Sequence, residues 1–416
     1  MLTLNLIREK KEFVTGRLKI KNFESGEIIE RILSIDSERR EIQVKADNMQ
    51  AEMNRISKEI GSLMKDGKKP EAESAREKTF AIKNEIRVLT DKLGPLEEQL
   101  REEIVKLPNL PHESVPAGYG ADNNVMVREG GKIPSLPENA LPHWELIKNY
   151  DIIDFDLGIK LTGAGFPVYK GKGAKLERAL INFFLDEGSK AGYTEMMPPI
   201  MVNEDSGFGT GQLPDKEGQM YHAGLDNFYL IPTAEVPVTN IYRDVILSSD
   251  QLPVRNVAYT PCFRREAGSW GAHVRGLNRL HQFDKVEIVQ IAHPEHSYEA
   301  LEEMVNHVES LVARLGLPYR IMKLCGGDMS FTSALTYDFE VWSAAQKRWL
   351  EVSSVSNFES FQANRLKCRF REKGEKQTKL VHTLNGSALA LPRIVAALLE
   401  NNQTGSGIRI PGILVP

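Results

Sequence analysis

Three segments in the C-terminal half of the chain contain residue types that could bind a nucleotide. The first contains Arg264, Phe283 and Glu287, which could hold a phosphate, a base and an ammonium group respectively. In an extended strand, Phe283 and Glu287 would share a face with Lys285 and Val289, because side chains alternate with a period of two. A half-exposed strand with surface ion pairs would show the same pattern, so this segment alone leaves both interpretations open.

The other two segments add a metal-binding pattern and a further cation. The second contains Glu351 and Ser354, whose hard oxygen atoms suit a Mg²⁺ ion shared with substrate phosphates. The third runs from a strand into a helix. Its Gly386 and Ala388 are small enough for a ligand to approach closely, and Arg393 lies in the first turns of the helix. Each segment is weak alone, but together they favour a nucleotide site built on an antiparallel sheet.

Several other kinds of site are not supported by the sequence. It has no P-loop, no complete Gly-x-Gly-x-x-Gly fingerprint and no Gly-x-Ser-x-Gly elbow. His293 and His296 are separated by a proline and lack a third ligand at zinc spacing, which favours the first turn of a helix. Cys262, Cys325 and Cys368 are far apart and form no Cys-x-x-Cys pair, so we expect a reducing compartment, the cytoplasm.

Composition indicates a soluble globular protein. The chain has 416 residues, which predicts about two or three domains. Hydrophobic residues make up 41% and charged residues 26%, and no long apolar run predicts a membrane helix or a signal peptide. The net charge of −4 argues against sequence-independent coating of nucleic acid, but it permits a local basic face.

The N-terminal quarter predicts two long helices that form an antiparallel coiled-coil hairpin. Apolar residues repeat every 3.5 positions on average from Ile28 to Leu63, interrupted only by Arg39, and again from Ala75 to Leu100. The flanking positions are mostly charged, which favours a solvent-exposed hairpin over helices lying on a core. The first helix should be about 55 Å long, and Pro95 should kink the second.

The elements that must position the candidate site residues follow a proline- and glycine-rich stretch, which we interpret as a linker. Beyond it the sequence predicts helices at 175–190 and 297–315, strands at 254–263 and 281–291, and a helix at 394–400. Strands joined by a glycine-rich loop, without regular βαβ alternation, indicate a mostly antiparallel sheet with flanking helices.

Four short stretches together resemble the motifs of class II aminoacyl-tRNA synthetases, and in particular those of the bacterial-type seryl-tRNA synthetase family. They are Gly192-Tyr-Thr-Glu-Met-Met-Pro-Pro199, similar to the end of motif 1; Ile231-Pro-Thr-Ala-Glu-Val-Pro237, similar to the serine-pocket signature; Phe263-Arg-Arg-Glu-Ala-Gly-Ser269 with His281-Gln-Phe-Asp-Lys-Val-Glu287, similar to motif 2; and Asn385-Gly-Ser387 with Arg393, similar to motif 3. One departure is Pro392, where many members have glycine; a proline is tolerated in a first helical turn.

The resemblance covers essentially the whole chain and implies an α+β fold. This fold combines a class II synthetase catalytic domain, an antiparallel sheet flanked by helices, with an N-terminal antiparallel coiled-coil hairpin. The implied parts are an N-terminal tRNA-binding domain at 1–107 with its arm at about 28–105, a linker at 108–142, and a catalytic core at 143–416 with motif 1 at about 176–200, motif 2 at about 255–291 and motif 3 at about 383–401.

The implied activity is serine–tRNA ligation. Such an enzyme activates L-serine with ATP to give seryl-adenylate and pyrophosphate, and then transfers serine to the terminal adenosine of tRNA(Ser) and also of tRNA(Sec). The resemblance further implies a homodimer in which the coiled coil crosses to tRNA bound by the other subunit. It implies Mg²⁺ with the ATP, no zinc, no membrane and a cytoplasmic location.

The resemblance also assigns residue roles. Arg264 should bridge the serine carboxylate and the α-phosphate, and Phe283 and Arg393 should enclose the adenine. Glu287 should pair with the ammonium of serine. The implied catalytic residues are Arg264, Arg393 and Glu351; the metal ligands are Glu351 and Ser354. The implied ATP-binding residues are Arg264, Arg265, Glu266, which contacts the adenine amino group, Arg275, which holds the β,γ-phosphates, Phe283, Glu351, Val352, Ser353, Ser354 and Arg393. The implied serine-binding residues are Thr233, Ala234, Glu235, Arg264, Glu287, Asn385 and Ser387.

Two other functions share part of this pattern. An amino-acid:carrier-protein ligase has the same catalytic fold but lacks a long hairpin, so the arm at 28–100 argues against it. A degenerate paralogue acting as a binding protein is disfavoured by intact Arg264, Glu287, Glu351 and Arg393.

Overall fold

The chain divides into two compact units. The computed structural model describes residues 1–215, 218–265 and 275–415. One unit comprises Met1–Lys19 and Phe23–Pro108, and the other Ile20–Asn22 and Asn109–Pro416. In the described residues no helix is both long enough and apolar enough to cross a membrane.

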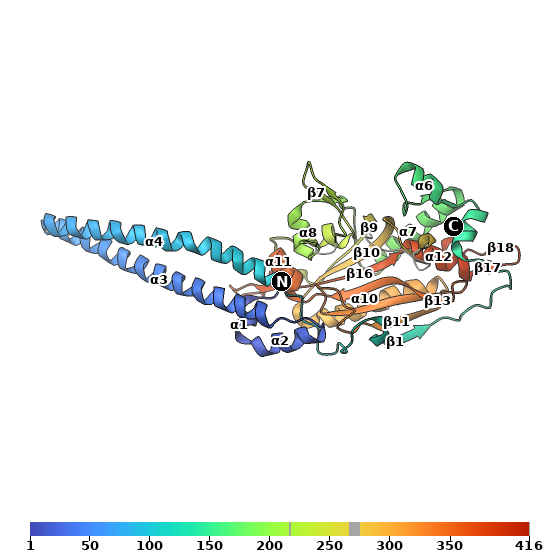
Figure 1. The fold of residues 1–416 in the computed structure, drawn as a ribbon, viewed down its shortest axis with the longest axis horizontal. Coiled ribbons are helices and arrows are strands. Elements are labelled where there is room, and N and C mark those ends of the chain that lie inside the picture. The colour runs from blue at the N-terminus through green and yellow to red at the C-terminus, as the bar shows by residue number, and fades with distance from the viewer. Residues whose placement is uncertain (216–217, 266–274, 416) are drawn as a thin grey trace. The chain divides into compact units, whose positions relative to one another are not determined.

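The N-terminal unit is a helical hairpin preceded by two short helices. The short helices are α1 (Leu4–Glu9) and α2 (Lys11–Ile20), and the long ones are α3 (Gly26–Lys65) and α4 (Lys69–Ile104). The long helices lie side by side along their length (Figure 1). Every predicted seam position is at least partly buried, whereas most flanking positions are exposed, which confirms the predicted seam. Helix α4 continues through Pro95.

A buried carboxylate explains the charged residue in the seam of α3. Asp36 accepts hydrogen bonds from Arg39 Nη2 at 2.9 Å and from Arg8 Nε of α1 at 3.0 Å. Arg39 therefore interrupts the apolar repeat because it neutralises Asp36, which lies buried beside it.

The C-terminal unit is built on one large sheet. Its eight strands are all antiparallel to their neighbours except β4, which pairs in parallel with β9. Their order is β1 (Val125–Gly130), β11 (Tyr319–Lys323), β12 (Leu335–Ser343), β13 (Arg348–Asn357), β16 (His382–Ala390), β10 (Gln282–Ala292), β9 (Val254–Phe263) and β4 (Thr194–Met196). This sheet confirms the antiparallel class predicted from the sequence, and β9 has the predicted bounds.

Strand β1 departs from the expected linker at 108–142. It pairs with β11 at the edge of the sheet, and the second unit already begins at Asn109. Most of its side chains are exposed, so it lacks the apolar alternation by which a strand is predicted from sequence. The prolines and glycines around β1 led to the prediction of a linker, although this segment contains an edge strand.

Three helices cover one face of the sheet, which carries the largest apolar core, while the other face carries polar side chains among smaller apolar clusters. They are α7 (Gly171–Lys190), α10 (Ser297–Arg314) and α12 (Leu391–Asn401), close to the predicted bounds. Val286 and Ile288 of β10 face the apolar core that includes Leu180 of α7 and Met304 of α10. Lys285 and Glu287 alternate with them and face the other side.

The remaining elements connect or border this sheet. The helices are α5 (His143–Asn149), α6 (Phe155–Leu161), α8 (Glu204–Thr210), α9 (Glu235–Asn240) and α11 (Ser360–Leu366), with 3-10 turns η1 (Ala121–Asn123), η2 (Ser249–Gln251), η4 (Gly276–Asn278), η5 (Pro294–His296) and η6 (Gly412–Leu414). The short strands are β2 (Ile153–Asp154), β3 (Val168–Tyr169), β5 (Met201–Val202), β6 (His222–Ala223), β7 (Phe228–Leu230), β8 (Ile246–Ser248), β14 (Arg369–Arg371), β15 (Lys379–Leu380), β17 (Gln403–Thr404) and β18 (Gly407–Ile408).

Candidate active site

The sheet brings the three polar segments of the sequence together. Strand β10 lies between β9 and β16, and β13 pairs with the other edge of β16. Glu287 is opposite Ser387 of β16, and Asn385 of that strand is opposite Ser356 of β13. The predicted convergence of these segments on one antiparallel sheet is therefore confirmed.

Five buried polar side chains form the centre of the site, which we call the inner pocket: Thr233, Glu235, Lys285, Glu287 and Ser387. Lys285 Nζ lies 2.5 Å from Glu287 Oε2 and donates a hydrogen bond to Thr233 Oγ1 at 2.7 Å. Ser387 Oγ donates to Glu287 Oε2 at 3.3 Å. All five side chains are at least nine-tenths buried, so their charges interact in a medium of low polarity.

Glu235 is the residue of the inner pocket with the most perturbed acidity. Burial raises its pKa to about 7, and the neighbouring carboxylate of Glu287 acts in the same direction. A hydrogen bond from Gln362, the charge of Lys285 and a hydrogen bond from Asn385 partly oppose this rise. Near pH 7, Glu235 is therefore present in both its neutral and its ionised form.

Sequence reasoning missed Gln362. Its Nε2 donates to Glu235 Oε1 at 2.6 Å, and its Oε1 accepts from Thr383 Oγ1 at 2.7 Å. The second bond orients the amide, so that the donor end points at Glu235. No local pattern marks this glutamine, because its partners are distant in the chain.

Arg264 and Phe283 are in contact at the edge of the inner pocket. The guanidinium carbon of Arg264 is 5.2 Å from the centre of the Phe283 ring, and Arg264 Nε donates to the carbonyl of Pro232. Ala234, also a predicted serine-binding residue, is fully buried at the start of α9, so its backbone is the part that could bind a ligand.

Arg393 is held where β16 passes directly into α12. Its Nη1 donates to the carbonyl of Glu351 at 2.7 Å and its Nε to the carbonyl of Asn278 at 3.0 Å. Pro392 lies in the first turn of α12, where its missing N–H is tolerated, as expected.

The predicted metal ligands lie together on β13. The carboxylate of Glu351 is half-exposed, and Ser354 Oγ donates at 2.6 Å to Asp338 Oδ1 on β12. Burial, and next the charge of Glu351, raises the pKa of Asp338. Sequence reasoning missed Asp338, because it lies on a different strand.

Some predicted residues of β13 and β16 do not face a ligand. Val352 is buried in the apolar core, so only its backbone could contact ATP. Ser353 Oγ donates to the carbonyl of Ser387 at 2.5 Å. Gly386 and Ala388 were expected to admit a ligand. A side chain at 386 would instead meet Val355, and Ala388 lies in the core, so small residues are needed here for packing between strands.

The arginines that are predicted to bind ATP in motif 2 are not all close to the inner pocket. The guanidinium of Arg275 stacks over Trp144 at 5.0 Å and lies 3.4 Å from Glu145 of α5. Arg265 is exposed, and its backbone N–H donates to the carbonyl of Gln219. Glu266 lies outside the described residues.

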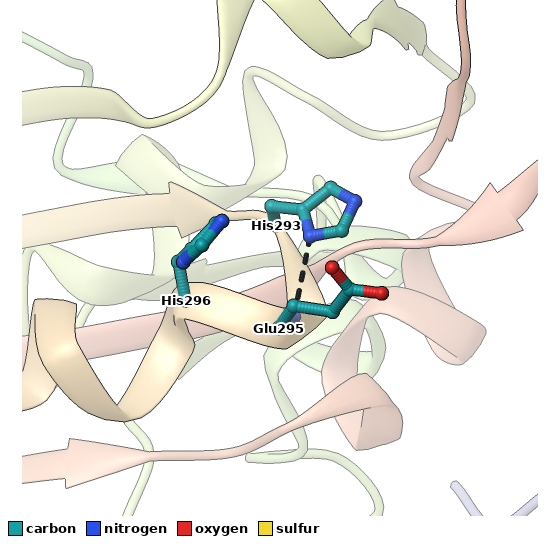
Figure 2. Close-up of side chains that lie close together, drawn as sticks. All are labelled: His293, Glu295 and His296. Carbon is teal, nitrogen blue, oxygen red and sulfur yellow. Dashed lines mark hydrogen bonds between the residues drawn. The ribbon is translucent and has the colours of Figure 1, made fainter.

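The cluster of His293, Glu295 and His296 precedes helix α10, as predicted. Their possible ligand atoms lie within 4.8 Å of one another (Figure 2). His293 Nδ1 accepts a hydrogen bond from the backbone N–H of Glu295 and its Nε2 contacts Glu372, while His296 Nδ1 contacts Glu299. These contacts favour a helix start over a metal centre.

The whole chain matches known proteins. Residues 1–111 match the family model of the seryl-tRNA synthetase N-terminal domain, and residues 220–402 match the tRNA synthetase class II core domain (G, H, P, S and T). The chain is 50% identical to a serine–tRNA ligase from Salinibacter ruber, over 100% of this chain and 97% of that protein. A serine–tRNA ligase from Chlorobium luteolum is 46% identical over the same shares.

Solved structures agree with these matches. The crystal structure of seryl-tRNA synthetase from Pyrococcus horikoshii complexed with ATP superimposes with a TM-score of 0.93, at 33% identity, covering 100% of this chain and 97% of that one. A cytoplasmic serine–tRNA ligase from Naegleria fowleri in complex with AMP shares the fold, with a TM-score of 0.87 at 23% identity and coverage of 100% and 96%.

Proposed function

Because the chain belongs to the seryl-tRNA synthetase family, we propose that its inner pocket binds serine and that the surface around Arg264, Phe283 and Arg393 binds ATP. The chain is a serine–tRNA ligase by this membership. The observation that most supports the assignment of the pocket is the group of five buried polar side chains on the face of the sheet opposite α7, α10 and α12.

The first reaction joins serine to the nucleotide without a covalent protein intermediate. The carboxylate of serine attacks the α-phosphorus of ATP, a new carboxyl–phosphate bond forms, and the bond to the β-phosphate oxygen breaks to release pyrophosphate. The attacking group is already an anion, so no general base is needed. Positioning and charge stabilisation do the work, and Arg264 supplies guanidinium donors between carboxylate and α-phosphate.

Serine recognition is assigned to the inner pocket and its border. Glu287 receives the ammonium group, and Thr233, Glu235, Asn385 and Ser387 surround the hydroxyl. Burial of these polar groups supports this assignment, because alanine would leave them without a partner. Ala234 contributes through its backbone.

ATP recognition is assigned to the border of the pocket. Phe283 and Arg393 enclose the adenine, and Glu266, Arg265, Val352 and Ser353 complete the nucleotide site. Arg275 would have to leave Trp144 in order to hold the β,γ-phosphates.

The residues present fit a magnesium ion with the ATP. Glu351 and Ser354 would hold it: the Glu351 carboxylate is half-exposed, and Ser354 donates its proton to Asp338, which leaves its oxygen lone pairs for a cation. The ion would neutralise charge on the phosphates. We expect no zinc.

The second reaction transfers serine to the terminal adenosine of tRNA(Ser), and we extend the proposal to tRNA(Sec). The match of residues 1–111 to the seryl-tRNA synthetase N-terminal domain supports a hairpin that contacts tRNA by shape and phosphate contacts. It also argues against the carrier-protein ligase considered above. We further propose a cytoplasmic homodimer with tRNA bound across subunits.

Exchange of radioactive pyrophosphate into ATP tests the proposed site. Exchange should depend on serine, and substitution Glu287→Gln should raise the KM for serine by about tenfold or more. Unchanged KM values in this variant would refute the assignment of the pocket, whereas exchange driven by another amino acid would refute the substrate.

A further inference from the structure

The ammonium group of Lys285 is enclosed within the inner pocket, and it is not among the groups proposed to contact serine or ATP. Its Nζ lies between Glu287 Oε2, at 2.5 Å, and Thr233 Oγ1, at 2.7 Å, and the side chain is 6% exposed. An ammonium group can only donate hydrogen bonds, so both contacts have a defined direction.

This direction determines what Thr233 can offer a ligand. The hydroxyl oxygen of Thr233 accepts from Lys285 Nζ and also, at 3.3 Å, from the backbone N–H of Glu235. A hydroxyl has two acceptor positions and one proton. With both acceptor positions used, Thr233 presents its proton, and only its proton, to a ligand.

Lys285 also contacts Glu287. Its Nζ lies 2.5 Å from Glu287 Oε2, the same oxygen that accepts a hydrogen bond from Ser387 Oγ at 3.3 Å. The ammonium only donates, so this contact holds the Glu287 carboxylate in place as an acceptor.

We propose that Lys285 is a positioning residue that makes Thr233 a hydrogen-bond donor and holds Glu287 as an acceptor in the inner pocket. The inference rests on the proposed function. A donor beside an acceptor fits a ligand that has an oxygen able to accept and an ammonium able to donate, which are the two polar groups that distinguish serine from alanine and from a hydroxy acid. Lys285 does not itself touch the reacting atoms.

Pyrophosphate exchange with Lys285→Met tests this inference. We expect the KM for serine to rise about tenfold or more, with the KM for ATP changed less than about twofold, because only the serine end of the site loses its arrangement. Two charged groups act on the pKa of Glu235: Glu287 raises it and Lys285 lowers it. We therefore also expect the pH at which the KM for serine changes to move upward, since Glu235 loses its neighbouring cation. Lys285→Ala should be partly rescued by added ethylammonium, which the unaltered enzyme should ignore.

Lys21→Met is the matched control. Lys21 is a half-buried lysine of the same unit, and it donates to the carbonyls of Ser330 and Ser333 at 2.8 and 2.7 Å. Its loss should lower the melting temperature without changing the KM for serine or its pH profile. An equal rise of that KM in Lys21→Met would overturn the inference, because the effect would then come from general loosening of the fold.

Other outcomes also decide between the alternatives. A rise in the KM for ATP as large as that for serine would mean that Lys285 contacts phosphate, and unchanged kinetics would mean a structural role; either overturns the inference.

If the Lys285 variants do not fold, inhibition of the unaltered enzyme by L-2,3-diaminopropionate and by L-alanine decides. Diaminopropionate should inhibit more weakly than alanine, because its side-chain ammonium would lie against the ammonium of Lys285 and the hydroxyl proton of Thr233. Stronger inhibition would refute the inference. Loss of serine-dependent exchange in the unaltered enzyme would refute the proposed function instead.

Discussion

The carboxylate of Glu235 accepts a hydrogen bond from the amide of Gln362 at 2.6 Å, across 127 positions of the sequence. This bond favours the ionised form of Glu235, whereas burial and the charge of Glu287 favour the neutral form. The balance brings the pKa of this pocket carboxyl to about 7.

The KM for serine should therefore depend on pH. Ionised Glu235 can accept a hydrogen bond from the serine hydroxyl, so we expect this KM to fall as the pH rises through about 7. Gln362→Leu removes the bond that favours ionisation and should move the change to higher pH. Pyrophosphate exchange measured at several pH values checks both; a flat profile would show that Glu235 does not titrate in the pocket.

Phe283→Leu should weaken ATP binding. Stacking of a base on an aromatic ring contributes roughly 1–3 kcal/mol, so the KM for ATP should rise by about 5- to 150-fold. Phe283→Tyr keeps the aromatic face and serves as the control, with a KM close to that of the unaltered enzyme. A Leu variant that binds ATP normally would exclude stacking on this ring.

Thr233→Ser should relax the exclusion of threonine. The variant keeps the hydroxyl that contacts Lys285 but removes one methyl group, which opens space for the extra methyl of threonine. A single methyl is worth roughly 1–3 kcal/mol of discrimination, so the preference for serine should fall by about 10-fold or more. The ratio of kcat/KM for the two amino acids in pyrophosphate exchange measures it; an unchanged ratio would place the exclusion elsewhere.

Removal of the hairpin should separate the two reactions. At its base, Arg31 Nε lies 3.2 Å from Glu103 Oε2, so residues 32–100 can be replaced by a short glycine-rich linker. Serine-dependent pyrophosphate exchange should persist, whereas charging of tRNA(Ser) should be lost, because the shape-reading arm is gone. A shortened protein that unfolds at the same temperature but loses both reactions would contradict the proposal that the hairpin is needed for tRNA charging and not for serine activation.

Glu177→Gln should remove a pH-dependent loss of stability. Both carboxylate oxygens of Glu177 on α7 are buried without a hydrogen-bond partner in the described residues, and burial, then the charge of Asp284, raises its pKa well above the usual range. The folded state therefore binds a proton that the unfolded state loses above about pH 4.5, so stability falls as the pH rises, by up to about 1.4 kcal/mol per pH unit. Denaturation at pH 5 to 8, roughly, should show a flatter profile for the variant.

Glu187→Gln on the same helix is the control for Glu177. Burial opposes ionisation of Glu187, but hydrogen bonds from Lys190 and Arg314 outweigh it and lower its pKa. Its contribution to stability is therefore present above its unfolded pKa and lost as the pH falls. The control variant should keep the decline toward high pH. An identical decline in Glu177→Gln would show that another group causes it.

The fold was most predictable where local periodicity decides it. The 3.5-residue seam predicted the hairpin, because this signal depends only on neighbours in sequence. The segment 254–263 was likewise predicted as a strand, and β9 has these bounds. Strand β1 escaped prediction because an exposed edge strand has no such signal. Gln362, Asp338 and the contacts of Lys285 escaped as well, since each is defined by a partner on another element.

The absence of a loop between β16 and α12 has a mechanical consequence. Asn385 and Ser387, which we assign to serine, and Arg393, which we assign to ATP, lie on a strand and a helix that follow each other without a loop. The separation between the two substrates is thereby set by a count of residues along the backbone. Inserting a single residue at this junction would turn the helix by about 100° relative to the strand, so that one substrate could be aligned only at the expense of the other.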